Sequence, residues 1–309
     1  MESQLVYIVM LNYNGSKLTI ESVKSFNKIK YSNYRILIVD NNSTDDSFNV
    51  LNEKLKQYKK CTLIKLHENL GYSGGNNVGI KKALENNADY ILIANNDIIV
   101  EENFLGYLVN SLNIDKKIAV VTPKIYYFGS NIINSFGAYK SLLGKIKNIG
   151  IHKKDNEKYE KDIYVKYVMG CCVMFRASIF HEVGTFDERF FMYLEESDLF
   201  ERINKKYKLQ VVAGSKIWHK EFSSSNKNNT SGKVNYFCTY YIRRNSLLYA
   251  DKNYGYKGLV AKLYYMAVDL CKIFLHFKDK QLRKVIKLAW SDYFKSNYFR
   301  SNVIQKLIE

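Results

Sequence analysis

The sequence predicts an α/β fold in which a doubly wound, mostly parallel sheet is flanked by helices and followed by a C-terminal helical extension. Two observations support this class. Over residues 1–125, short apolar segments alternate with segments of helical periodicity, which is the pattern of repeated β-α-β units. After residue 250, apolar residues recur at helical spacing alone.

The expected elements follow in order along the chain. Five apolar segments, which we expect to be strands, span residues 5–11, 34–39, 62–66, 90–94 and 118–121. The helical patterns between them cover about residues 16–29, 45–57, 76–87 and 101–112.

The alternation stops after residue 125. Lys145–Lys161 is polar and predicts an exposed loop or hairpin, and the apolar Tyr164–Phe175 predicts a strand. A helix over Glu195–Lys206 and a strand over Leu209–Ala213 follow, and Ser223–Lys233 has the Gly, Ser and Asn content of a loop. Two further helices are expected at 235–250 and about 257–277.

Composition limits the function. The chain of 309 residues carries 47 Lys and Arg against 30 Asp and Glu, a formal charge of +17, which favours an anionic partner such as nucleic acid, anionic lipid or a phosphorylated substrate. No nucleic-acid-binding signature accompanies the charge. Five cysteines without a CxxC pair predict neither disulfides nor a zinc site. The N-terminus does not resemble a signal peptide and no apolar stretch reaches about 18 residues, so we expect a cytoplasmic protein.

Polar clusters follow the predicted strands, where open α/β sheets bind ligands. Asn12–Gly15 follows the first strand, Asp40–Ser43 the second and Asn95–Asp97 the fourth, while the glycine-rich Asn69–Asn77 precedes a helix, whose N-terminus favours anions. Each cluster alone could equally be a turn or a helix cap. Together they predict a nucleotide-phosphate site, and the absence of GxGxxG after the first strand and of GxxxxGK[ST] disfavours a dinucleotide site or a P-loop.

Seven segments in this order resemble the family 2 glycosyltransferases of the GT-A fold, and the rhamnosyltransferase-like branch in particular. They are LNYNG, IVDNNSTDDS, ENLGYSGGNNVGI, YILIANNDIIV, GTFDERFFMYLEESDLFERI, WH and YYIRRN. The resemblance runs from about residue 5 to 250. It implies a GT-A domain over 1–250, with a nucleotide-binding part at about 1–125 and an acceptor-side part at about 126–250, and leaves 251–309 as a basic amphipathic helical extension.

The resemblance implies inverting transfer of rhamnose or a hexose from a dTDP- or UDP-sugar to a saccharide acceptor, lipid-linked, in cell-surface polysaccharide assembly. Asp40 matches a carboxylate that accepts a hydrogen bond from N3–H of uracil or thymine, which suits an acceptor-only group. The other implied donor-binding residues are Asn12, Asn14, Gly74, Asn76, Asn96, Gly170 and Arg244. Arg244 belongs to Arg243-Arg244-Asn245, which matches the family's Arg-Asn element near the diphosphate, and a solvated basic helix face is the alternative.

A divalent metal, Mg or Mn, is implied because the leaving diphosphate must be neutralised. Asp97 matches the last position of the family's Asp-x-Asp metal motif, whereas the first position is the neutral Asn95. The resemblance therefore implies either a weaker metal site or one completed by His219. A helix cap for Asp97 and a strand-end position for His219 are the alternatives.

The general base is implied in the segment Glu195-Glu196-Ser197-Asp198. Glu196 stands where the family usually has Asp as the base, a substitution that keeps the carboxylate but lengthens its reach by one methylene. The dipole of the helix start favours its ionised form. Glu195 is the competing candidate, and Asp198 is expected to orient the site or bind acceptor. An acidic first helical turn without catalytic role is the alternative.

The extension holds 12 Lys and Arg against 5 Asp and Glu. Its pattern predicts a basic amphipathic helix pair, for which three partners remain open: an anionic membrane surface, which would make the protein peripheral, the catalytic domain, or a second subunit in a homodimer. Two further functions also remain open: an inactive GT-A binding or scaffold protein, because of Asn95 and Glu196, and a sugar nucleotidyltransferase, although NYNG lacks the expected basic Gly-rich loop.

Overall fold

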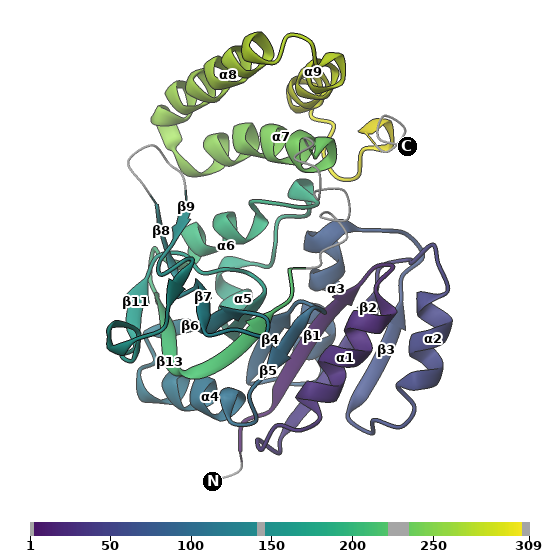
Figure 1. Ribbon diagram of the computed structural model, residues 1–309, viewed down its shortest axis with the longest axis vertical. Helices are drawn as coiled ribbons and strands as arrows, with labels where there is room; N and C mark the ends of the chain where they lie inside the picture. Colours follow the sequence, from purple (N-terminus) through teal and green to yellow (C-terminus); the bar gives the residue numbers. More distant parts are fainter. Residues whose placement is uncertain (1–2, 141–145, 222–234, 305–309) are drawn as a thin grey trace. The chain divides into compact units, whose positions relative to one another are not determined.

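The computed structural model describes residues 3–140, 146–221 and 235–304 (Figure 1). They form two compact units. The first comprises Met1–Asn69, Gly75–Thr185 and Arg202–Phe222, and the second comprises Leu70–Gly74, Phe186–Glu201 and Ser223–Glu309. The predicted boundary at residue 250 falls inside helix α7 (Tyr236–Asn253) of the second unit. The predicted loop Ser223–Lys233 lies outside the described residues.

The first unit is built on a mixed sheet. Its strands are β1 (Val6–Asn12), β2 (Tyr34–Asp40), β3 (Cys61–Lys65), β4 (Tyr90–Ala94), β5 (Ile98–Val100), β6 (Ile118–Tyr127), β7 (Ile132–Ser135), β10 (Lys153–Lys154), β11 (Ile163–Val165), β12 (Cys172–Arg176) and β13 (Lys208–His219). The order is β10-β7-β6-β12-β4-β1-β2-β3, and β13 pairs with β5, β6 and β11. Strands β3, β2, β1 and β4 are parallel, as predicted.

The helices complete the α/β arrangement that the periodicity predicts. They are α1 (Ser16–Phe26), α2 (Ser47–Lys54), α3 (Gly71–Glu85), α4 (Phe104–Ile114), α5 (Ile179–Val183), α6 (Glu195–Ile203), α7, α8 (Gly258–Leu275) and α9 (Lys280–Phe294). Helices α1 and α2 lie side by side, α4 packs on β6 and β13, and α7 contacts both α8 and α9 (Figure 1). A small hairpin is formed by β8 (Ala138–Lys140) and β9 (Ile146–Asn148).

Apolar strand residues form the core that positions the polar strand ends. Ile8, Met10, Ile38 and Leu92 are buried together with Phe26 of α1 in one cluster. Strands that are buried on both faces read as continuous apolar segments, which explains why the sequence identifies β1, β2 and β4 to within about one residue.

Two segments differ from the prediction. The expected strand at 164–175 is two strands: β11 pairs with β13, whereas β12 pairs with β4 and β6. The expected strand at 118–121 continues to Tyr127, because β13 pairs alongside β6 as far as that residue. This pairing contains an irregularity, since Val212 pairs with Pro123 and Lys216 with Lys124.

The glycine-rich segment is also different from the predicted loop. Helix α3 begins at Gly71, five residues before the expected start, so Gly74 and Asn76 lie within a helix. A Cβ atom on Gly75 would lie 2.4 Å from Leu11 Cδ1. Close packing on β1 therefore explains this glycine, and tertiary packing overrides the low helix propensity that made the segment resemble a loop.

Candidate functional site

The carboxyl ends of β1 and β2 bring Asn12 and Asp40 together. These last residues of the two strands are register partners, and Asn12 Nδ2 donates a hydrogen bond to Asp40 Oδ2 at 2.8 Å. Ser43 donates to the same carboxylate through its backbone N–H (3.0 Å) and its hydroxyl (2.6 Å). Asp40 is fully buried, and both of its carboxylate oxygens accept hydrogen bonds from the protein.

The network extends to two more of the predicted residues. Thr19 donates to Asn12 Oδ1 at 2.7 Å, and Asn96 Nδ2 donates to the Thr19 hydroxyl at 2.9 Å. Asn14 receives the backbone N–H of Thr44 at 2.8 Å. The structure therefore joins Asn12, Asn14, Asp40 and Asn96 in one polar cluster at the edge of the sheet.

Sequence reasoning missed the two hydroxyls that link this cluster, those of Thr19 and Ser43. Ser43 follows Asp40 by three residues, a spacing that suits a side-chain turn, and this was the available signal. Thr19 lies in the first turn of α1 and offered no signal in the sequence, because its position depends on how α1 packs.

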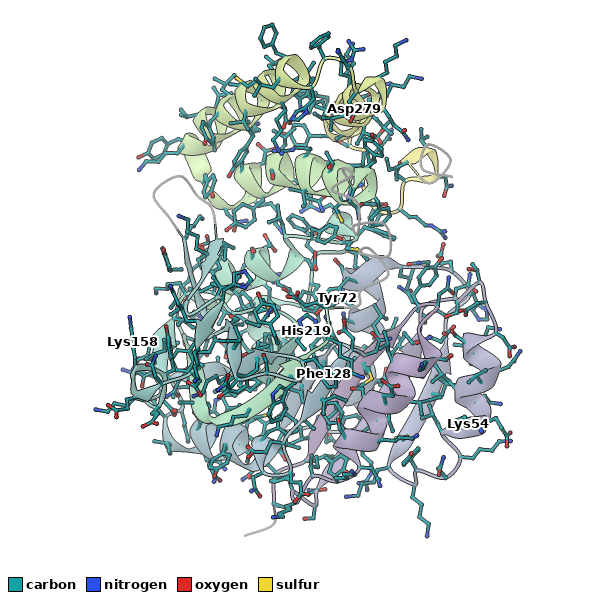
Figure 2. All side chains as sticks on the ribbon, in the orientation of Figure 1. Lys54, Tyr72, Phe128, Lys158, His219 and Asp279 are labelled. Atoms are coloured by element: carbon teal, nitrogen blue, oxygen red, sulfur yellow. The ribbon has the colours of Figure 1, made fainter. Side chains whose placement is uncertain are left out.

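Asp97 and His219 meet at the next part of the same edge. His219, labelled in Figure 2, pairs with Ile98 across β13 and β5, which places it beside Asp97. His219 Nε2 lies 3.2 Å from Asp97 Oδ1, and Asp97 is only 3% exposed. Among the described residues, neither Asp97 Oδ1 nor His219 Nδ1 has a hydrogen-bond partner.

A buried carboxylate oxygen without a hydrogen-bond partner is costly, and a bound cation is one way to offset that cost. The carboxylate and imidazole are both ordinary ligands for divalent metals. Asn95 lies on the same turn and donates its backbone N–H to the carbonyl of Cys171 at 2.8 Å, which places Gly170 next to the turn. The described part of the chain contains no group of three His, Cys, Asp or Glu side chains that could hold a metal.

The acidic start of α6 belongs to the second unit. Glu195 is buried and its Oε2 has no hydrogen-bond partner among the described residues. Burial raises the pKa of Glu195 well above its ordinary value, and the negative charge of Glu196 raises it further. Burial raises the pKa of Glu196 to about 7, although a hydrogen bond from Tyr72 acts in the opposite direction. Desolvation of Glu196 therefore opposes the helix dipole, which favours the ionised form.

Asp198 is held by the helix that follows. Lys252 Nζ lies 2.9 Å from Asp198 Oδ2, and Asn253 Nδ2 donates to Oδ1 at 3.1 Å. Lys252 also pairs with Asp187. Burial alone raises the pKa of Asp187, but hydrogen bonds from Arg189 and Lys252 outweigh it and hold this pKa well below its usual range. Asp198 is thus one of two carboxylates that share a cation.

The guanidinium of Arg244 is bound by the protein itself. It is fully buried and donates to three backbone carbonyls: those of Arg189 (3.0 Å), Phe190 (2.9 Å) and Phe299 (2.9 Å). Its Nε donates to Asn245 at 3.0 Å. The prediction that Arg244 contacts the diphosphate does not agree with this geometry, because every nitrogen of its guanidinium already donates to the protein.

Arg244 and Asn245 hold the turn that leads into α6. Asn245 Nδ2 donates to the carbonyls of Phe190, Met192 and Tyr193 at 2.8, 2.8 and 2.9 Å. This turn contains three non-glycine residues with positive φ: Phe191 (62°), Tyr193 (71°) and Leu194 (72°). Such residues persist only when the surroundings fix them, and strained backbone of this kind clusters at functional sites.

Gly71 meets the same turn. It has a φ of +71°, and a Cβ atom there would lie 2.3 Å from the carbonyl oxygen of Phe191. Ser73 donates its backbone N–H to that oxygen at 3.2 Å. The start of α3 is therefore shaped by contact with the 189–194 turn, and the neighbouring Tyr72 (labelled in Figure 2) supplies the hydrogen bond to Glu196.

Comparison with known sequences identifies related proteins. A family model described as "Glycosyl transferase family 2" matches residues 7–184. A low-salt glycan biosynthesis hexosyltransferase of Haloferax volcanii is 25% identical over 205 residues, which are 64% of this chain and 61% of the relative. An N-acetylglucosaminyl-diphospho-decaprenol L-rhamnosyltransferase of Mycobacterium tuberculosis is 25% identical over 241 residues, which are 72% of this chain and 76% of the relative.

Solved structures share the fold. GalNAc-T7 with UDP, GalNAc and Mn2+ superposes with a TM-score of 0.61 at 15% identity, covering 80% of this chain and 50% of that one. S. aureus TarS in complex with UDP-GlcNAc superposes with a TM-score of 0.59 at 15% identity, covering 94% and 80%. At these identities the likeness establishes the GT-A fold.

Proposed function

This chain belongs to glycosyl transferase family 2 and is a glycosyltransferase, and from that premise we propose that it moves rhamnose or a hexose from a dTDP- or UDP-sugar to a saccharide acceptor with inversion. The observation that carries the proposal is the buried Asp97 Oδ1 that faces His219 without a hydrogen-bond partner among the described residues. It lies at the sheet edge that also carries Asn12 and Asp40, where this fold class binds ligands.

The donor nucleotide is proposed to lie against the Asn12–Asp40 cluster. Once the Ser43 hydroxyl turns away, Asp40 accepts a hydrogen bond from N3–H of uracil or thymine, which cytosine cannot donate. Asn14, Asn96 and Gly170 are proposed to line the same region. Gly74 and Asn76 are proposed to contribute through the first turns of α3, whose N-terminus favours the diphosphate.

Asp97 and His219, with Asn95 on the same turn, are proposed to hold Mg or Mn. When bound, such a cation neutralises the leaving diphosphate as a Lewis acid. The neutral Asn95 lowers the negative charge of the site compared with a pair of carboxylates. We therefore expect weak metal binding in the absence of the nucleotide and tighter binding in its presence.

Glu196 is proposed as the general base. The acceptor hydroxyl attacks the anomeric carbon, the bond from that carbon to the diphosphate breaks with its electron pair, and the hydroxyl proton passes to Glu196. A base is most effective when its pKa lies near the working pH, and the pKa of about 7 supports this role. Glu195 is the second candidate, and Asp198, paired with Lys252, is proposed to position the acceptor side of the site.

The acceptor is proposed to be a lipid-linked saccharide in cell-surface polysaccharide assembly, with the reaction on the cytoplasmic side of the membrane. The support is the name of the M. tuberculosis relative, whose acceptor is a diphospho-decaprenol saccharide. The proposed donor sugar is either rhamnose or a hexose, because one relative is a rhamnosyltransferase and the other a hexosyltransferase.

The test is a panel of UDP- and dTDP-sugars with Mg or Mn, with and without a lipid-linked acceptor, in which release of nucleoside diphosphate is measured. We expect release that depends on one donor, the metal and the acceptor. Pyrophosphate formation from UTP or dTTP and a sugar phosphate would instead identify a nucleotidyltransferase. Donor binding without release for any acceptor would identify a GT-A binding protein.

A further inference from the structure

Helix α8 presents its apolar side chains outward. Leu259, Val260, Leu263, Tyr264, Leu270, Phe274 and Leu275 are exposed on the helix, and Tyr256 and Phe277 extend the exposed set at its two ends. Tyr256 is 88% and Phe274 80% exposed. We call this set the α8 apolar face. Contiguous apolar surface of this kind marks an interaction site in a folded protein.

The side chain that α8 buries, among its described residues, is polar. Asp269 is buried, accepts a hydrogen bond from Trp290 Nε1 at 3.0 Å and lies 3.0 Å from Arg243 Nε. Lys262 pairs with Asp251 at 2.6 Å. An amphipathic helix of a globular core buries its apolar side, so α8 is inverted with respect to that rule.

Helix α9 follows the ordinary rule. Its Val285, Ile286 and Ala289 are buried in the second unit. The basic extension predicted from the sequence therefore contains one outward apolar face, which belongs to α8 alone among the described helices. Among the described residues, no helix is both long enough and apolar enough to cross a bilayer.

The charges around the face are positive. Lys257 is exposed at the start of α8, and Lys278 and Lys280 are exposed just after its end. The acids of this region are engaged elsewhere: Asp251 and Asp269 in the ion pairs above, and Asp279 as the N-cap of α9, where it accepts from Leu282 N at 2.8 Å. The outward face therefore combines apolar side chains with lysines at both ends.

We propose that the α8 apolar face docks on an anionic lipid bilayer, with Lys257, Lys278 and Lys280 at the headgroups. Charge complementarity favours this occupant over a second copy of the chain. Two copies of the face would bring lysines against lysines in either orientation, because both ends of α8 carry the same charge. The proposal stands independently of which sugar is transferred, and it would place the enzyme where a lipid-linked acceptor lies.

The test is co-sedimentation of the full chain with phosphatidylcholine vesicles, with and without phosphatidylglycerol. We expect binding to the anionic vesicles, and a loss of about tenfold or more for Leu270→Ser with Phe274→Ser, because two apolar side chains leave the bilayer. The matched control is Ile114→Ser on α4, which removes an apolar side chain that is 84% exposed outside the face and should leave binding unchanged.

A second pair of variants tests the contribution of the lysines to vesicle binding. Lys278→Gln should weaken binding to anionic vesicles by about fivefold, since one basic residue at such a surface contributes on that order. Lys158→Gln, an exposed lysine of the first unit (Figure 2), should have no effect. Light scattering without vesicles reports the oligomeric state. The proposal is overturned if wild type does not bind anionic vesicles, if the α8 variants bind as wild type does, or if they instead convert a dimer to a monomer.

Discussion

Arg244 of α7 donates a hydrogen bond from Nη2 to the backbone carbonyl of Phe190 at 2.9 Å. This bond joins a buried cation to the turn that leads into Glu195 and Glu196. The neighbouring Asn245 adds three bonds to the same turn. The base of the proposed reaction is thus supported by backbone contacts, whereas the resemblance had placed Arg244 at the diphosphate.

Arg244→Lys should destabilise the protein, because a lysine cannot satisfy the three carbonyls that the guanidinium reaches. Buried unsatisfied polar groups cost about 1–3 kcal/mol each, so we expect at least about 2 kcal/mol less free energy of unfolding. Thermal or denaturant unfolding measures this, with the exposed Arg35→Lys as control. An unchanged stability together with a raised KM for the donor would return Arg244 to the diphosphate.

Asp97→Ala should abolish transfer that depends on a divalent metal, because the variant loses the carboxylate that lies beside His219. His219→Ala should raise the metal concentration needed for half-maximal rate. The rate of nucleoside diphosphate release against Mn concentration measures both. Asp46→Ala, which changes an exposed acid at the start of α2, is the control. A near-normal rate with normal metal dependence in Asp97→Ala would exclude the metal assignment.

Glu196→Gln should lower kcat by about 10²–10⁴-fold, the usual contribution of a positioned general base. Donor affinity should stay nearly constant, since the amide keeps the shape of the side chain but cannot take a proton. Glu195→Gln should be milder. Steady-state kinetics and donor binding separate the two variants. A larger kcat loss in Glu195→Gln, or a binding defect in Glu196→Gln, would move the base to Glu195 or Asp198.

The pH profile should follow the same group. With a pKa of about 7, Glu196 is mostly protonated below neutrality, so kcat should rise with pH through about 7 and then level off. Removal of the Tyr72 hydroxyl in Tyr72→Phe takes away a hydrogen bond that stabilises the charged form, so the profile should shift to higher pH. A kcat that does not change between pH 6 and pH 8 would contradict the assignment of Glu196 as the base.

The buried Glu195 should make stability depend on pH with a defined sign. Its folded pKa is raised above the ordinary value of 4.5, so between these two values the unfolded chain binds fewer protons than the folded one. The free energy of unfolding contributed by this group therefore falls as pH rises above 4.5. Glu195→Gln should raise the melting temperature at neutral and higher pH and change it little at acidic pH.

The sequence predicted the parallel strands and the polar residues at their ends, because buried strands are continuous apolar segments and ligand sites follow their carboxyl ends. Asp97 and His219 are 122 positions apart in the chain, and the β5–β13 pairing brings them together. The resemblance implied that His219 completes the site of Asp97, but neither the resemblance nor the composition predicted this strand pairing. The pKa of Glu196 was missed because burial depends on the packing of the whole second unit.

The sequence also could not predict that the apolar side of α8 is exposed. Helical periodicity identifies an apolar side and a polar side, but the ordinary expectation is that the apolar side is covered. Only the buried position of Asp269, paired with Arg243, shows which side of α8 turns inward. The start of α3 at Gly71 was missed for a related reason, since its glycines are explained by contacts with β1 and with Phe191.

The pairing of β13 after its irregularity limits where residues can be inserted into or deleted from this strand during evolution. His219 faces Asp97 because β13 keeps its register with Ile98 after the interruption between Val212 and Lys216. One residue inserted after Lys216 would bring Trp218 opposite Ile98 and turn the imidazole to the other face of the sheet. Relatives that keep this histidine should therefore vary in side chains along β13 but keep a constant spacing between Lys216 and His219, while the interruption itself absorbs insertions and deletions.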